Sequence, residues 1–192
     1  MKTAILGGSF NPVHSGHLSI AEEVIKNGYQ KILFIPVAIP PHKTLARGAS
    51  DADRLAMLKL ALQDFSWAEL WRGEIYRSGP SYSIDTVREL KENGILDSRA
   101  AIIIGDDLAD DFSSWKDVPR LLDEVNIILA RRDVKREVEF QYPCFRLPNT
   151  PVPYSSSEIR QRIENGLSIG RLVPLPVTEY IERNRLYGFA QT

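Results

Sequence analysis

The sequence predicts an α/β protein built on an open, doubly wound parallel sheet. Residues 3–7 and 31–37 are continuous apolar runs, a pattern typical of strands that are covered on both faces. Between them, residues 15–27 repeat apolar side chains at helical spacing, and Gly28 stands where a glycine commonly ends a helix. A strand, a helix and a second strand in this order predict a right-handed crossover between parallel strands. We therefore expect ligands beyond the carboxyl ends of the strands, where such sheets bind them.

Alternating helices and strands are expected to follow this first unit. Residues 50–62 predict a helix capped by Ser50, and residues 67–76 have the composition of a strand. Residues 83–94 predict another helix, capped by Ser83 and ended by a glycine. The remaining strands are expected at residues 100–105 and 125–130.

A small helical extension is predicted at residues 155–192. It follows the proline-rich loop at residues 146–154, and its two helices are expected at residues 155–166 and 176–188. No repeat, low-complexity tract or interdomain linker interrupts the sequence. We therefore expect a single domain over residues 1–192, with a Rossmann-like sheet at its centre.

The composition excludes several classes of protein. Twenty-four Lys and Arg residues nearly balance 25 Asp and Glu residues, which argues against binding nucleic acid by neutralising its phosphates. A single cysteine, Cys144, excludes an intramolecular disulfide and a thiolate metal cage. No apolar run approaches the roughly 20 residues needed to span a bilayer. We expect a soluble cytoplasmic protein without nucleic-acid or membrane partners, and the sequence leaves open whether it forms a homo-oligomer.

The first strand ends in a loop whose residues suit phosphate binding. Gly7 and Gly8 lack Cβ atoms, so a ligand can approach the main chain closely. The helix that follows points its N-terminus, with free N–H groups, at the same place. His14 and His17 are three residues apart and would share one face of that helix, from which both could reach one anion. The spacing matches neither the dinucleotide fingerprint nor the Gly-Lys-Ser/Thr phosphate loop.

Two other interpretations of this loop compete with phosphate binding. The glycines could make only a tight turn while the histidines lie on the surface. A zinc site could instead use His14 and His17 together with His42 and a carboxylate. Phosphate binding is favoured because two histidines at a strand-to-helix junction are unusual, and because the ligand supply for zinc is poor.

The stretch "GGSFNPVHSGH" resembles the signature loop of the nucleotidyltransferases marked by His/Thr-x-Gly-His. That loop alone indicates a superfamily that also contains cytidylyltransferases and phosphopantetheine adenylyltransferase. Further motifs make the chain similar to the bacterial nicotinate-nucleotide adenylyltransferases, over residues 3 to about 188. These are "PPHK" (40–43), "SYSIDT" (81–86), "IIGDDL" (103–108), Trp115, "SSSEIR" (155–160) and "YIERNRLYG" (180–188).

The resemblance implies that the 5′-phosphate of nicotinate mononucleotide attacks the α-phosphorus of ATP. The products would be deamido-NAD and pyrophosphate, with Mg²⁺ carried by the ATP phosphates and no metal ligand from the protein. The residues agree, because the sequence offers no obvious activated serine or cysteine nucleophile and catalysis can rest on positioning and charge stabilisation. Two alternatives stay open: a related adenylyl- or cytidylyltransferase acting on nicotinamide mononucleotide or another phosphate acceptor, and a non-catalytic nucleotide sensor.

On the ATP side, the resemblance implies catalytic roles for His14, His17 and Arg160. Arg160 would hold the leaving phosphates, although it could equally lie on a solvated helix face beside Glu164. Asp107 would hold a ribose hydroxyl, or would cap the segment that follows it. Gly16 would leave room for adenine or ribose. The other ATP-binding residues implied are Gly7, Gly8, Ser9, Phe10, Gly105, Ser156 and Ser157.

On the acceptor side, the resemblance offers Trp115 as a stacking platform for the pyridine ring. Thr86 and nearby backbone N–H groups would read the carboxylate of that ring. Trp115 could equally be a core anchor, because tryptophan buries a large area wherever it lies. His42 and Lys43 would contact phosphate from a loop, and His42 could also be a solvated loop tip. Arg131 would lie near the nucleotide, although the sequence cannot distinguish it from Arg132.

Three residues depart from the family pattern. Asn11 stands where aspartate is frequent, and Ser157 stands where threonine is usual; both keep hydrogen-bonding chemistry. Asp106 stands where a small residue is common. Its carboxylate would repel phosphate unless it faces away or meets Mg²⁺.

Overall fold

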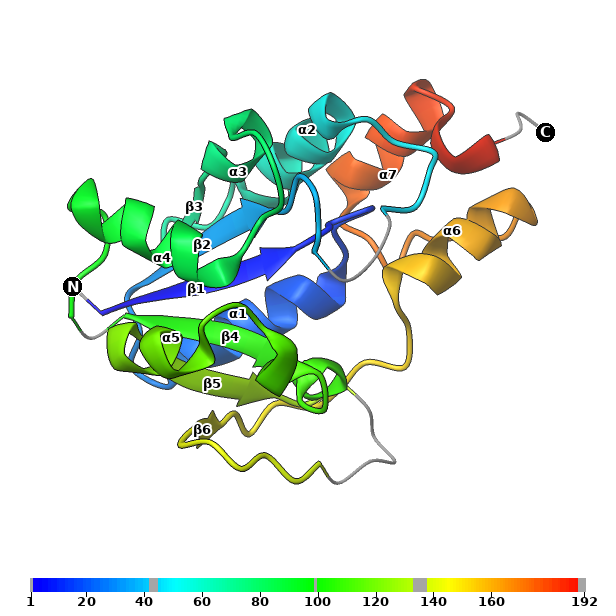
Figure 1. The fold of residues 1–192 in the computed structure, drawn as a ribbon. Coiled ribbons are helices and arrows are strands. Elements are labelled where there is room, and N and C mark those ends of the chain that lie inside the picture. The colour runs from blue at the N-terminus through cyan, green and yellow to red at the C-terminus, as the bar shows by residue number, and fades with distance from the viewer. Residues whose placement is uncertain (1, 42–44, 99, 133–137, 190–192) are drawn as a thin grey trace.

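The computed structural model describes residues 2–41, 45–98, 100–132 and 138–189 and contains a six-stranded, all-parallel sheet (Figure 1). The strand order is β3-β2-β1-β4-β5-β6, so the chain starts in the middle, builds one half outward and returns to build the other. This order confirms the predicted doubly wound sheet. The strands are β1 (Thr3–Gly8), β2 (Lys31–Pro36), β3 (Ala68–Leu70), β4 (Ala101–Gly105), β5 (Asn126–Ala130) and β6 (Phe145–Arg146).

Both faces of the sheet are covered by helices, which explains the continuous apolar runs. Along β1, Ala4 and Leu6 point to one face while Ile5 points to the other, and all three are buried. The first face packs against α1 (Ser15–Lys26), α2 (Asp51–Leu62), α6 (Ser156–Glu164) and α7 (Leu175–Arg183). The second face packs against α4 (Ser83–Glu92) and α5 (Val118–Glu124). The short helical turns are α3 (Gly73–Tyr76), η1 (Asp106–Leu108), η2 (Phe112–Ser114) and η3 (Leu186–Gly188).

The helix ends follow local chemistry in most places. Ser50 caps α2 by accepting from the Asp53 N–H, and the Asp53 carboxylate accepts from the Ser50 N–H in return. Gly28 adopts a φ of +88° directly after α1, as its position predicts. The expected cap of α4 was wrong by one residue, because Ser83 is already helical and Tyr82 precedes it as the N-cap.

The predicted strand at residues 67–76 was also wrong beyond its first residues. Strand β3 ends at Leu70, and the chain then turns into the short helix α3. The Trp71 ring folds over Gly73 so closely that any Cβ there would clash with it. Glu74 is buried and accepts a hydrogen bond from Thr86 on α4. The hydrogen bond between Glu74 and Thr86 joins residues 12 positions apart on two different helices, so the composition of residues 67–76 could not reveal it.

The helical extension begins and ends differently from its prediction. Helix α7 stops at Arg183, short of the expected residue 188, and Arg185 and Tyr187 then take left-handed conformations. Helices α6 and α7 lie at the end of the molecule toward which the strands point (Figure 1). Ile159 and Ile181 from these helices join the same core as the sheet. None of the helices in the described ranges is both long and apolar enough to cross a membrane.

Candidate active site

A cavity of about 800 Å³ opens at the carboxyl ends of the strands. It lies beside β1 and β4, where the two halves of the sheet diverge, which is where the fold predicts a ligand. Its size is that of a small-molecule site. Its walls come from the signature loop, the start of α1, the residues after β4 and β5, the loop at residues 149–155, and the start of α6.

The signature loop lines the cavity with its backbone and with Ser9, while the Phe10 ring packs on the inner side of the loop. Gly7 faces open space, since a Cβ there would meet no atom within 4 Å. A Cβ on Gly8 would lie 3.2 Å from the Phe10 ring. Phe10 is fully buried with a φ of 45°, and its ring lies 4.9 Å from that of His17. Phe10 stood among the expected ATP-binding residues, but its ring belongs to the core and does not line the cavity.

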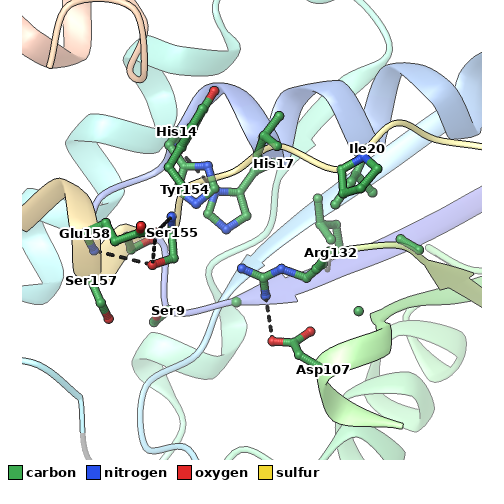
Figure 2. Close-up of a pocket in the computed structure, with 18 of the residues that line it drawn as sticks. Ser9, His14, His17, Ile20, Asp107, Arg132, Tyr154, Ser155, Ser157 and Glu158 are labelled. Atoms are coloured by element: carbon green, nitrogen blue, oxygen red, sulfur yellow. Dashed lines mark hydrogen bonds and ion pairs between the residues drawn. The ribbon is translucent and has the colours of Figure 1, made fainter. Parts of the chain in front are cut away.

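The two histidines stack against each other at the first turn of α1 (Figure 2). Their ring centroids are 3.8 Å apart, and His14 is the residue immediately before the helix. His17 Nδ1 accepts a hydrogen bond from the His14 backbone N–H at 3.2 Å. The neutral His17 ring therefore carries its proton on Nε2 and can donate it from there.

The His14 imidazole is buried, and its ring nitrogens are not satisfied by hydrogen bonds within the described residues. It is 2% exposed, and neither Nδ1 nor Nε2 has a hydrogen-bond partner among the described residues. Burial, together with the positive charge of Arg132, lowers the pKa of His14 to about 3. Buried donors and acceptors normally find partners, so a neutral His14 beside this cavity is suited to a ligand that supplies one.

Gly16 allows the start of α1 to pack closely against neighbouring side chains. A Cβ on Gly16 would lie 2.6 Å from Val152 Cγ2 and 3.0 Å from atoms of the His14 ring. The residue still lines the cavity. Close packing against the loop at residues 149–155 therefore also requires a residue without a side chain here, and room for adenine or ribose stays a prediction.

Arg132 reaches across the cavity to Asp107 (Figure 2). Arg132 Nη1 and Asp107 Oδ2 are 3.1 Å apart, and both residues line the cavity. Gly105 lies beneath the pair, where any Cβ would clash with both side chains. The alternative that Asp107 caps a helix is wrong, because η1 shows no side-chain cap and Asp107 pairs with Arg132.

The structure answers two questions that the sequence left open around this pair. Arg131 and Arg132 both line the cavity, and the Arg132 guanidinium makes the ion pair within it. Arg131 is held by its backbone, which exchanges two hydrogen bonds with the Asn149 side chain at 2.9 and 2.8 Å. Asp106 is buried, and its Oδ1 accepts from the Arg132 N–H at 2.9 Å. Its carboxylate therefore holds the turn after β5 and does not line the cavity.

The start of α6 docks onto the signature loop. Ser156 Oγ donates to the Pro12 carbonyl oxygen at 2.9 Å. Arg160 Nη1 donates to the Asn11 carbonyl oxygen at 2.7 Å, and its Nη2 donates to Ser157 Oγ at 3.0 Å. Arg160 therefore faces the cavity, and the alternative of a solvated face beside Glu164 is wrong.

Sequence reasoning missed Arg54, which lies under the signature loop. It is 1% exposed, donates from Nη1 to the Ser9 carbonyl oxygen at 2.8 Å, and pairs through Nη2 with Asp51 at 2.7 Å. A signal was available, because Arg54 stands three and four residues before Met57 and Leu58 on the apolar face of α2. A charge on such a face usually has a fixed partner.

Of the predicted acceptor residues, Arg131 lines this cavity, whereas Thr86 and Trp115 do not. Thr86 is 3% exposed, and its hydroxyl donates to Glu74 at 2.7 Å while accepting from Arg77 Nη2 at 2.8 Å. Trp115 packs against Phe112, with ring centroids 5.0 Å apart, at the edge of the second core. His42 and Lys43 lie outside the described residues.

The donor set of the cavity suits an anionic ligand better than a metal held by the protein. No cluster of three or more His, Cys, Asp or Glu residues with metal-binding geometry occurs in the described ranges. The two carboxylates that line the cavity are already engaged, Asp107 by Arg132 and Glu158 by Ser155. Mg²⁺ commonly reaches a protein on substrate phosphates, and this cavity is compatible with that.

A family model described as cytidylyltransferase-like matches residues 5–162, a span that contains every residue lining the cavity, and this match makes the chain a nucleotidyltransferase. A probable nicotinate-nucleotide adenylyltransferase of Borreliella afzelii is 38% identical over 188 residues, 97% of each chain. One of Synechococcus sp. is 41% identical over 199 residues, covering 97% of this chain and 94% of its own. The chain therefore belongs to the nicotinate-nucleotide adenylyltransferase family.

Solved structures give the same fold. Plasmodium falciparum nicotinic acid mononucleotide adenylyltransferase, complexed with NaAD, superposes with a TM-score of 0.76 at 22% identity, covering 99% of both chains. A Vibrio parahaemolyticus structure described as a putative nicotinate-nucleotide adenylyltransferase has a TM-score of 0.70 at 17% identity, covering 97% of this chain and 96% of that one. The resemblance seen in the sequence motifs is thus confirmed at the level of family and fold.

Proposed function

We propose that this chain transfers the AMP group of ATP to nicotinate mononucleotide, forming deamido-NAD and pyrophosphate. The observation that carries the proposal is the buried, unpartnered imidazole of His14 at the start of α1, beside His17 and facing Arg132 across the cavity. Phosphate oxygens would supply its missing partner. The names of the relatives at 38–41% identity support the same acceptor.

In the proposed reaction, the protein positions two polyanions in line. An oxygen of the mononucleotide phosphate bonds to the α-phosphorus as the bond from that phosphorus to the bridging oxygen breaks. The bridging oxygen leaves with pyrophosphate. Because a phosphate monoester is already anionic at neutral pH, its attack needs no general base, and the gain comes from orientation and charge stabilisation.

The histidines and Arg160 would stabilise the charge of the transition state. His14 and His17 would donate N–H groups to the α- and β-phosphate oxygens near the N-terminus of α1. A bound phosphate would raise the pKa of His14 from its low value, since an opposite charge favours imidazolium. Arg160, Ser156 and Ser157 at the start of α6 would hold the leaving pyrophosphate. Asp107 would exchange its contact with Arg132 for a ribose hydroxyl.

Mg²⁺ would be bound by the ATP phosphates, where it neutralises charge between them. The engaged carboxylates of Asp107 and Glu158 support a site in which the protein supplies no metal ligand. The residues of this chain would then act through cationic and neutral donors around the metal-bound triphosphate.

For the acceptor, we keep Trp115, Thr86, Arg131, His42 and Lys43 as proposed contacts. The Thr86 hydroxyl already uses its proton and one lone pair on Glu74 and Arg77. N–H groups at the start of α4 are therefore better placed than this hydroxyl to read the pyridine carboxylate. Such polar contacts can discriminate strongly between an acid and its amide.

The decisive experiment compares two acceptors side by side. Purified protein is incubated with ATP, Mg²⁺ and either nicotinate or nicotinamide mononucleotide, and dinucleotide and pyrophosphate are measured. We expect deamido-NAD as the faster product. Absence of product with both acceptors would overturn the proposal, and turnover of CTP instead of ATP would favour a cytidylyltransferase, the activity in the name of the matching family model.

A further inference from the structure

Asn11 joins three separate parts of the chain beside the cavity. It is 1% exposed, and its Nδ2 donates to the Ala46 carbonyl oxygen at 2.7 Å. Its Oδ1 accepts from the Tyr187 hydroxyl at 2.6 Å, across 176 positions of sequence. Its backbone carbonyl oxygen accepts from Arg160 Nη1 at 2.7 Å. One buried residue of the signature loop is therefore held from three sides.

The backbone near the C-terminus is shaped to deliver the Tyr187 hydroxyl. Tyr187 has a φ of 59° and Arg185 a φ of 50°, left-handed conformations that cost free energy in residues other than glycine. Gly48 makes room for the ring, because a Cβ there would lie 2.7 Å from Tyr187 Cδ1. Tyr187 is 4% exposed. The left-handed backbone and the close packing on Gly48 thus occur at the point where the chain reaches Asn11.

The chemistry of Asn11 matches both of its side-chain neighbours. An amide donates and accepts at once, so it satisfies the Ala46 carbonyl and the Tyr187 hydroxyl together. A carboxylate could accept from Tyr187 but would face the Ala46 carbonyl oxygen without a proton. Burial raises the pKa of Tyr187, so its hydroxyl remains a donor throughout the neutral range. Ala46 lines the cavity, so the same amide also fixes part of its wall.

We propose that Tyr187 and Asn11 are positioning residues for Arg160, so that the turn at residues 186–188 completes the leaving-group side of the site. By fixing the Asn11 side chain, Tyr187 aims the Asn11 carbonyl oxygen that holds the Arg160 guanidinium. This inference rests on the proposed function, in which Arg160 contacts the departing pyrophosphate. Neither Tyr187 nor the Asn11 side chain needs to touch substrate.

A matched pair of variants removes one hydroxyl at a time. Y187F deletes the donor to Asn11. Y180F is the control, because Tyr180 on α7 donates to Asp53 Oδ1 at 3.0 Å and makes no hydrogen bond to the signature loop within the described residues. We expect Y187F to lower kcat about tenfold, the order expected when a buried hydrogen bond is lost. The KM for the mononucleotide should stay within about twofold, and Y180F should keep kcat within about twofold.

A double-mutant cycle with R160A separates positioning from general stability. If Tyr187 acts through Arg160, Y187F should cost about tenfold in the parent chain and almost nothing in the R160A background. Equal fold losses in both backgrounds would overturn the proposal. Should Y187F fail to fold, N11D replaces it in the same cycle, because aspartate has nearly the same shape but places a carboxylate oxygen, in place of the N–H donor, against the Ala46 carbonyl oxygen. Coupling to Arg160 would support the proposal, and additivity would overturn it.

The cycle also has a readout that does not depend on turnover. If the parent chain forms no dinucleotide, the proposed function fails, and the four proteins are compared by calorimetric titration with pyrophosphate. Coupling between Tyr187 and Arg160 in pyrophosphate affinity would still support the positioning role. Independent effects on that affinity would reject it.

Discussion

Arg54 donates a hydrogen bond to the carbonyl oxygen of Ser9 from a position 45 residues away, with its side chain 1% exposed. This contact turns one carbonyl of the signature loop toward α2 and away from the phosphates expected above it. Arg54 also pairs with Asp51, whose side chain is about half exposed. The contact leads to the first of four predictions.

Replacing Arg54 with methionine should destabilise the fold and slow the reaction. The Ser9 carbonyl would lose its buried partner, which costs roughly 1–3 kcal/mol. Urea unfolding would measure the stability, and kcat/KM for ATP would measure the effect on the loop. D51N is the comparison, because asparagine keeps a side-chain oxygen that can accept from Arg54 Nη2, so it should cost less stability than R54M. Unchanged stability in R54M would contradict the assigned role.

Replacing His17 with alanine should reduce the rate much more than the affinity for ATP. The His17 Nε2–H is expected to strengthen its contact as charge builds in the transition state, so kcat should fall roughly 100-fold. The dissociation constant of ATP, measured by titration without acceptor, should change less than about fivefold. Equal losses in rate and affinity would instead indicate a role in binding alone.

Stability should fall with acidification because of His14. Its pKa is lowered from 6.5 to about 3 in the fold, so between these values the unfolded chain binds a proton that the folded chain does not. The contribution of neutral His14 to the free energy of unfolding is therefore fully present above about pH 6.5. It decreases as pH falls, by at most about 2 kcal/mol at pH 5. Urea unfolding at pH 7.5 and pH 5 would measure this. H14Q should show a smaller pH dependence, and an identical dependence would refute the assignment.

Replacing Gly105 with alanine should disturb the Arg132–Asp107 pair. A Cβ at this position clashes with both side chains, which must then move away from the end of β4. We expect kcat/KM for ATP to fall about tenfold or more, a loss of about 1.4 kcal/mol in transition-state binding. Stability should change little, because both clashing atoms belong to side chains that line an open cavity. G170A is the matched control, since the nearest atom to its Cβ would be Ser168 Oγ at 3.9 Å.

Local patterns in the sequence were sufficient for β1 to β5, although β3 is shorter than expected, and for the helices α1, α2, α4, α6 and α7. Strand β6 and helix α5 were not predicted. The apolar runs at residues 3–7 and 31–37 require burial on both faces, and a helix between them leaves a parallel crossover as the result. The motif residues His14, His17 and Arg160 all line the cavity. Such features could be predicted because they depend on residues close in sequence or on a short motif that can be recognised as a whole.

Other features could be seen only in the folded chain. Arg54 under Ser9 and Tyr187 against Asn11 are contacts between segments 45 and 176 positions apart, which local pattern does not relate. The choice of Arg132 as the partner of Asp107 also depends on how β5 lies beside β4. The role of a side chain in a site depends on which neighbours bury it and which of them form hydrogen bonds with it. Those neighbours come from remote positions, so tertiary packing decides them while periodicity and motif decide the scaffold.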